Sequence, residues 1–213
     1  MKSNKHQIQV VSKIMFGIYL FFAANPLWAE TEQDLAIQAP VNQLHEALID
    51  MMVSADSTSF QERYALMENI ITNKFNTPLI SRVVLSRYWK SLDKKAQTDF
   101  ITLFNSLTIS TYVDRFDSFD GESFKNISIE PMKKNRFIVK TEFIRTDDDP
   151  VSFNYIVQND NDEWKIISVI ANGINDLSLK RAEYSSVIKD QGFDSLVISL
   201  KGKINDLQPT TAQ

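Results

Sequence analysis

The chain has 213 residues, of which 43% are hydrophobic and 11% aromatic, and its formal net charge is −4 at neutral pH. This length and composition predict a globular domain with a sizeable core and exclude a largely disordered chain. The excess of acidic residues argues against nucleic acid as a partner, because phosphate binding needs a basic face.

The first 29 residues have the order of a secretory signal peptide. Three lysines at positions 2, 5 and 13 precede an almost unbroken apolar run over residues 14–24, and the small residue Ala29 ends the segment. The run is shorter than the roughly 20 residues that span a bilayer. Cleavage after Ala29 is therefore favoured over an uncleaved membrane anchor. It would leave 20 basic and 27 acidic residues, a net charge of −7. We expect a periplasmic protein, and the absence of cysteine is compatible with that compartment.

Helical spacing of apolar residues dominates the first half of the mature chain. Residues 30–40 are polar and end at Pro40, so we expect them to form a loose lead-in. The last of the following helices begins at Asp93, is the longest, and carries a wide apolar stripe that stops at Asp120-Gly121. Four helices are expected around residues 44–52, 60–71, 77–89 and 93–119.

From residue 123 the apolar period changes from 3.6 to 2, which predicts strands. The clearest case is residues 151–158, where Val151, Phe153, Tyr155 and Val157 share one face. Short polar connections between the segments indicate an antiparallel meander. Four strands are expected at residues 123–130, 137–145, 151–158 and 164–170.

The fourth strand is apolar on both faces. Simple alternation places Trp164, Ile166 and Ile170 on one face and Ile167 and Val169 on the other. After it, the turn at residues 172–173 leads into two helices, over residues 176–189 and from residue 193 to about 200. A polar tail covers residues 209–213. We therefore predict an α+β domain over residues 30–208, in which a four-stranded antiparallel sheet packs against N-terminal helices and two C-terminal helices.

Residue types that carry catalysis are scarce. Beyond the signal peptide there is one histidine, His45, and the chain has no cysteine. This leaves no thiol nucleophile, no Ser–His pair with an obvious orienting group and no histidine-based zinc site. We interpret His45 as a surface residue.

The remaining candidate motifs are interpreted as structural features and not as catalytic or binding sites. Acidic clusters at residues 147–149 and 160–163 lack the ligand spacing of a calcium loop and are interpreted as solvated turns. The turn at Asn172-Gly173 has no base partner and no Gly-x-Ser-x-Gly pattern, which argues against a nucleophile elbow. With only five glycines the chain has no phosphate-binding loop. We expect no catalytic residue, no metal and no cofactor.

Two stretches resemble the MlaC family, also called the toluene-tolerance auxiliary family. The first is "LSRYWKSLDKKAQTDFITLFNSLTISTYVDRFDSF" (85–119), with its Tyr-Trp pair, a capped turn, Gln then Phe, and a late Thr-Tyr. The second is "WKIISVIANGINDLSLKRAEYSSVIKDQGFDSLVISL" (164–200), which is similar to the closing signature of the family. With the signal peptide, the likeness covers nearly the whole mature chain.

Some positions depart from the family pattern. Ser168 stands where many members carry Asp, and Ile174-Asn175 replaces the usual Val-Ser. The segments "ISRVVLSRYW", "RFDSFDGESF" and "NGINDLSLKRAEY" are more similar to the branch associated with hopanoid biosynthesis. The expected cargo is therefore either a phospholipid or a hopanoid-like lipid.

The resemblance implies a non-catalytic periplasmic shuttle that carries lipid between the inner and outer membranes. Its partners would be an inner-membrane ABC-type lipid transport complex and an outer-membrane lipid-handling protein. An apolar pocket between sheet and helices would hold the acyl chains. Its lining is expected to comprise Phe104, Leu107, Tyr112 and Phe116 of the long helix, Phe137, Val139, Phe143, Phe153 and Tyr155 of the strands, and Ile174 and Leu177 beyond the turn. Weaker candidates for contact with a headgroup or partner are Arg82, Arg87 and Arg181.

Two other functions stay open from the residues alone. A cone-shaped enzyme similar to ketosteroid isomerase would need a buried pocket acid with a raised pKa, and Glu142 is expected on the polar face of its strand. A structural envelope protein would have a filled core without a cavity of roughly 300 Å³.

Overall fold

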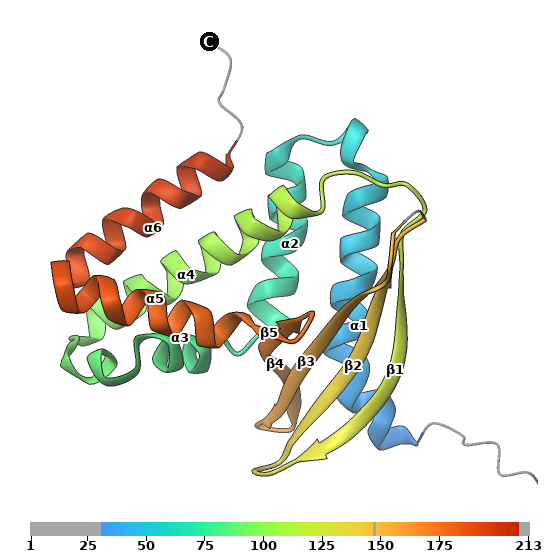
Figure 1. The fold of residues 1–213 in the computed structure, drawn as a ribbon, viewed down its shortest axis with the longest axis horizontal. Coiled ribbons are helices and arrows are strands. Elements are labelled where there is room, and N and C mark those ends of the chain that lie inside the picture. Colours follow the sequence, from blue (N-terminus) through green and yellow to red (C-terminus); the bar gives the residue numbers. More distant parts are fainter. Residues whose placement is uncertain (1–30, 147, 209–213) are drawn as a thin grey trace, which may run out of the picture. The chain divides into compact units, whose positions relative to one another are not determined.

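The computed structural model describes residues 31–146 and 148–208 (Figure 1). The predicted signal peptide and the polar tail lie outside the described residues, as does Asp147 of the first acidic cluster. The described helices are α1 (Glu32–Val53), α2 (Phe60–Lys74), α3 (Thr77–Leu85), α4 (Lys94–Arg115), α5 (Asp176–Gln191) and α6 (Phe193–Leu207), with short 3₁₀ turns η1 (Ala55–Ser57) and η2 (Ser86–Ser91). The described strands are β1 (Ser123–Met132), β2 (Arg136–Ile144), β3 (Val151–Asp160), β4 (Glu163–Ala171) and β5 (Ile174–Asn175).

Helix α1 begins at Glu32, so the prediction of a loose lead-in over residues 30–40 was wrong. A capping box starts the helix: the Thr31 hydroxyl accepts a hydrogen bond from the Asp34 amide at 3.1 Å, and the Asp34 carboxylate accepts one from the Thr31 amide at 3.3 Å. Pro40 lies inside the helix, where it removes one backbone hydrogen bond. Ile37 and Val41 are fully buried on either side of it, and their burial offsets that cost.

The next three helices start where the sequence indicates, and each has a polar capping residue. Ser59 forms a capping box with Glu62 at the start of α2, and Asp93 caps α4. The cap of α3 is Asn76, whose side chain accepts a hydrogen bond from the Leu79 amide. Helix α4 ends at Arg115 and not at residue 119, because Phe116 leaves helical conformation.

The sheet confirms the antiparallel meander, with strand order β1-β2-β3-β4-β5. The described part of the chain has five strands where four were predicted, because the chain pairs for two more residues after the turn at Asn172-Gly173. Both turn residues have positive φ, 47° and 78°, as in a type I′ hairpin turn. Asn175 then caps α5 by accepting a hydrogen bond from the Ser178 amide at 3.0 Å. The stretch is thus a tight hairpin that leads directly into a helix.

A bulge in β4 corrects the predicted faces of that strand. Ile156 pairs with Ser168 and Val157 pairs with Ile166, so Ile167 is an extra residue without a partner across the ladder. The extra residue shifts the alternation by one, and Ile170 lies on the face opposite to Ile166. Both Ile166 and Ile167 are buried.

One face of the sheet, here called the inner face, packs against the helices. Helix α1 contacts β1, β2 and β4, whereas α2, α3 and α5 contact β4. Helix α4 packs against α2, α3 and α6, and α5 packs against α3 and α6. Figure 1 shows α1 behind the sheet and α4, α5 and α6 beyond its β5 edge. No helix within residues 31–146 and 148–208 combines the length and the apolar run needed to cross a bilayer.

Candidate functional site

Aromatic rings from several elements meet where the inner face of the sheet approaches α1 and the end of α4. We call this set the aromatic cluster; it consists of His45, Phe75, Tyr112, Phe116, Phe124, Phe143, Phe153 and Tyr155. Its members come from α1, the α2–α3 link, α4 and its C-terminal cap, and strands β1 to β3. Segments far apart in the sequence therefore build one aromatic surface.

Phe143 is the centre of this cluster. Its ring centroid lies 5.7 Å from that of Phe116, 4.8 Å from that of Phe124 and 6.2 Å from that of Phe153. The contacts to Phe116 and Phe153 are edge-to-face, which is a favourable arrangement for aromatic quadrupoles. Through Tyr112, which contacts Phe116 at 5.9 Å, the cluster continues along α4.

The structure brings five of the predicted lining residues together in this cluster. They are Tyr112, Phe116, Phe143, Phe153 and Tyr155. Val139 pairs with Tyr155 across the β2–β3 ladder and is fully buried beside the cluster.

The other predicted lining residues lie farther from this centre. Phe137 contacts Trp164 at 5.4 Å along the inner face. Phe104 contacts Phe100 at 6.1 Å, and Phe100 in turn contacts Tyr184 and Phe193 of the helical layer.

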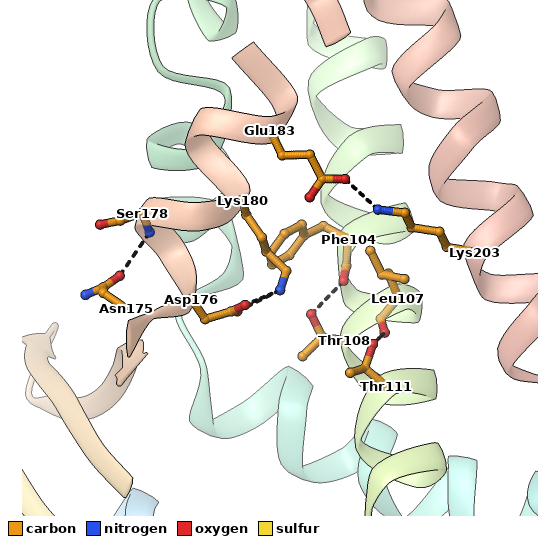
Figure 2. Close-up of polar contacts among 10 residues, drawn as sticks. All are labelled: Phe104, Leu107, Thr108, Thr111, Asn175, Asp176, Ser178, Lys180, Glu183 and Lys203. Carbon is orange, nitrogen blue, oxygen red and sulfur yellow. Dashed lines mark hydrogen bonds and ion pairs between the residues drawn. The ribbon is translucent and has the colours of Figure 1, made fainter. Parts of the chain in front are cut away.

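Leu107 lies one turn after Phe104 on α4 and is buried. Figure 2 shows that the hydroxyls of Thr108 and Thr111 donate back to the Phe104 and Leu107 carbonyls, at 2.8 and 2.7 Å.

The segment beyond the hairpin turn forms a partly exposed margin. Ile174 is 57% exposed, and Leu177 is half-buried and packs against the core. Figure 2 shows Asp176 in an ion pair with Lys180 one turn later, at 2.6 Å. This pair, together with the Asn175 cap, stabilises the first turn of α5.

The inner face keeps accessible apolar surface beside sealed positions. Val139 and Tyr155 are 0% and 1% exposed. Other apolar residues on the same face are only partly buried, namely Phe124, Phe137, Val151, Phe153 and Trp164. Large apolar side chains are more often sealed in a filled core.

His45 is buried, so its interpretation as a surface residue was wrong. Its ring stacks on Phe124 at 3.8 Å and 5°, and its Nε2 lies 3.1 Å from the Tyr155 hydroxyl. Burial lowers the pKa of His45 to about 3, so the ring is neutral at ordinary pH. Its spacing from Val41 and Leu48, by four and three residues, places it on the buried stripe of α1. That spacing is the signal that could have identified it.

Two further polar contacts near the cluster join different elements. Asn126 of β1 donates to the Asn42 side chain of α1 at 3.0 Å, and the Thr141 hydroxyl donates to the Phe153 carbonyl at 2.6 Å. Sequence patterns did not single out these residues, because their partners lie on other elements. They fix α1 and β3 against neighbouring strands without offering a charge.

The predicted arginines lie on the surface, outside the cluster. Arg82, Arg87 and Arg181 are all exposed. Arg87 donates to the Tyr88 hydroxyl at 3.1 Å and its guanidinium lies 5.0 Å from the centre of that ring. None of the three forms an ion pair with a residue that the structure describes.

Glu142, the acidic residue considered from the sequence, does not lie at the cluster. Glu142 is half-buried and pairs with Lys125 and Ser152 across the sheet, on the face opposite Thr141 and Phe143. Among the described residues, no three His, Asp or Glu side chains are grouped so that they could hold a metal ion.

A separate open groove of about 450 Å³ lies between α1, the end of α2 and the β3–β4 turn. Its lining mixes Trp164 with Lys74, Lys165 and acidic side chains, and includes none of the predicted lining residues.

Comparisons with known proteins agree with this architecture. The family model for the MlaC protein matches residues 42–202, from α1 into α6. A solved phospholipid-binding protein from Ralstonia solanacearum, in complex with a phospholipid, has a similar fold with a TM-score of 0.71 and 18% sequence identity. The match covers 80% of this chain and 98% of that one. No match was found among curated proteins. Since the family model covers most of its length, the chain belongs to the MlaC family.

Proposed function

We propose that this protein is a periplasmic lipid carrier that binds a phospholipid against the aromatic cluster. The observation that carries the proposal is the accessible apolar surface of the inner face, in a chain of the MlaC family. The similar Ralstonia protein binds a phospholipid, which supports the same class of cargo here.

The cost of exposing acyl chains to water explains why a lipid carrier needs an apolar surface. A diacyl lipid has roughly 30 methylenes, and at about 0.8 kcal/mol each their exposure to water costs on the order of 20 kcal/mol. A carrier must therefore cover the acyl chains with apolar side chains during transfer. Half-buried rings such as Phe124 and Phe153 supply that surface, and the predicted lining from Phe104 to Leu177 would extend it.

The transport route is the finer part of the proposal. The signal peptide predicted from the sequence would bring the chain to the periplasm. There it would receive or deliver lipid at an inner-membrane ABC-type complex and at an outer-membrane lipid-handling protein. The exposed Arg82, Arg87 and Arg181 are candidates for contact with anionic headgroups or with those partners.

The geometry favours binding over catalysis. The histidine of the cluster is neutral and hydrogen-bonded to Tyr155, and Glu142 lies on the opposite face of the sheet. An isomerase-like mechanism would need a carboxyl group among the rings. The proposal is therefore a carrier without a catalytic residue or a cofactor.

Lipid extraction tests the proposal. The full chain would be expressed in a Gram-negative host, purified from the periplasm without detergent and extracted with organic solvent for lipid mass spectrometry, against a mock purification. We expect about one phospholipid for each protein. A stoichiometric hopanoid, the other cargo that the sequence suggests, would keep the carrier function and change the cargo. No enriched lipid, with none taken up from vesicles, would contradict the function.

A further inference from the structure

The aromatic cluster has three polar members, and one of them has a hydroxyl without a partner. His45 and Tyr155 are hydrogen-bonded to each other at 3.1 Å. The Tyr112 hydroxyl forms no hydrogen bond with any residue in 31–146 or 148–208. A hydroxyl without a protein partner can donate to a bound molecule, so this group is a candidate for ligand contact.

The ring of Tyr112 is held in place by its neighbours. It stacks on Phe116 at 5.9 Å and meets Phe75 edge-to-face at 6.3 Å. The side chain interacts electrostatically with Tyr155 of the sheet, Asp176 of α5 and Arg115 of its own helix. The side chain is nevertheless only partly buried and keeps accessible surface.

The surroundings select the kind of group that this hydroxyl can bind. Burial raises the pKa of Tyr112, the Asp176 carboxylate raises it further and Arg115 lowers it by less, so the hydroxyl keeps its proton and is available as a donor. Because Asp176 and Arg115 act on the hydroxyl with opposite signs, and Lys180 is paired with Asp176, the position offers no excess positive charge that would attract an anionic acceptor such as a phosphate. A neutral carbonyl oxygen remains the suitable acceptor.

We propose that the Tyr112 hydroxyl donates a hydrogen bond to an ester carbonyl of the bound lipid and thereby selects diacyl over ether-linked lipids. The inference rests on the proposed function and specifies its ligand. In a diacyl lipid the ester carbonyls lie where the acyl chains meet the glycerol, so they accompany the chains into an apolar lining. An ether-linked lipid has the same chains but lacks those carbonyls.

The test is a competition for uptake. The purified full chain, stripped of lipid, is incubated with vesicles that contain equal amounts of diacyl and dialkyl phosphatidylglycerol of the same chain length. The ratio of the two lipids on the re-isolated protein is then measured by mass spectrometry. We expect the wild type to enrich the diacyl lipid about fivefold or more, the effect of one hydrogen bond. Tyr112→Phe keeps the ring contacts and should bring the ratio close to one.

Tyr184→Phe is the matched control, because Tyr184 is a buried tyrosine of the helical layer whose ring contacts Phe100 and, among the described residues, no ring of the cluster. It should keep the wild-type ratio. The inference is overturned if the wild type shows no enrichment, and this result does not depend on the folding of any variant. It is also overturned if Tyr112→Phe keeps the enrichment. Failure to take up either lipid would instead contradict the proposed function, and this inference with it.

Discussion

At His45 the fold buries a titratable ring without giving it a charged partner. Among the residues that the structure describes, its polar contact is the Tyr155 hydroxyl and its face is covered by Phe124, so burial keeps the ring neutral. Its pKa falls from 6.5 to about 3 through desolvation. The proton is therefore bound more tightly in the unfolded chain than in the native one, and acid must weaken the fold at this residue.

His45→Gln should remove this acid sensitivity. As the pH falls below about 6.5 the unfolded wild type gains a proton at this position that the native protein does not bind. Between pH 7 and pH 5 this costs about 2 kcal/mol of unfolding free energy. Denaturant unfolding at both pH values measures the change for each protein. The wild type should lose about that much more stability than His45→Gln, and an equal loss in both proteins would show that His45 does not titrate in this way.

At the scale of single elements, a short local feature outweighs the general pattern in several places. The capping box and flanking buried residues start α1 before Pro40, although proline is unfavourable inside a helix. One extra residue, Ile167, shifts the alternation in β4. The residues after it therefore lie on the opposite faces from those that simple alternation predicts. The positive φ of Asn172 and Gly173 turns β4 back on itself before α5.

Substitution by alanine at Gly173 of the hairpin turn and at Gly202 of α6 should change the stability of the protein in opposite directions. Gly173→Ala places a side chain at φ 78°, where no atom lies within 4 Å of the new Cβ, so the cost is purely conformational. We expect a loss of about 1 kcal/mol. Gly202→Ala lies inside α6, also without a close atom, and should add about 0.5–1 kcal/mol.

Denaturation midpoints of the two variants and the wild type provide the measurement. Equal stability of Gly173→Ala and wild type would mean that the hairpin turn relaxes to another conformation. A loss in Gly202→Ala would contradict the exposed, unstrained helical position assigned to that glycine.

At the scale of the whole molecule, the two faces of the sheet carry different kinds of residue. The inner face presents half-buried rings toward the helices, and the opposite face carries residues such as Lys140, Asn154 and Ile156. If the inner face binds lipid, polarity on that face should matter far more for lipid uptake than the same change on the opposite face.

A pair of substitutions on β3 tests this difference. Phe153→Asn places an amide among the rings of Phe124 and Phe143, whereas Ile156→Asn, three residues away, lies on the opposite face. We expect Phe153→Asn to lower the lipid bound per protein about tenfold or more, since the amide loses its water in the complex.

Ile156→Asn should stay close to the wild type. Circular dichroism identifies variants that remain folded, and lipid mass spectrometry gives the bound amount. Equal loss in two folded variants would exclude the inner face as the specific lipid surface.

Much of the architecture follows from local periodicity. The change from helical to alternating spacing near residue 123 predicts the order of helices and strands, and short polar turns predict the meander. Five predicted lining residues meet in the aromatic cluster because strand alternation and the α4 stripe each define a face. Alternation could not reveal the bulge at Ile167, because a bulge adds a residue without changing local composition.

The sequence by itself determined the order of elements, the resemblance to the MlaC family and the scarcity of catalytic residue types. These depend on near neighbours in the chain, on spacing and on composition. Only the tertiary structure decided that His45 is buried against Phe124 and Tyr155 and that the Tyr112 hydroxyl has no hydrogen-bond partner within residues 31–146 and 148–208. The reason is physical: periodicity assigns a residue to a face, but its burial and its partners depend on which distant segment packs against that face.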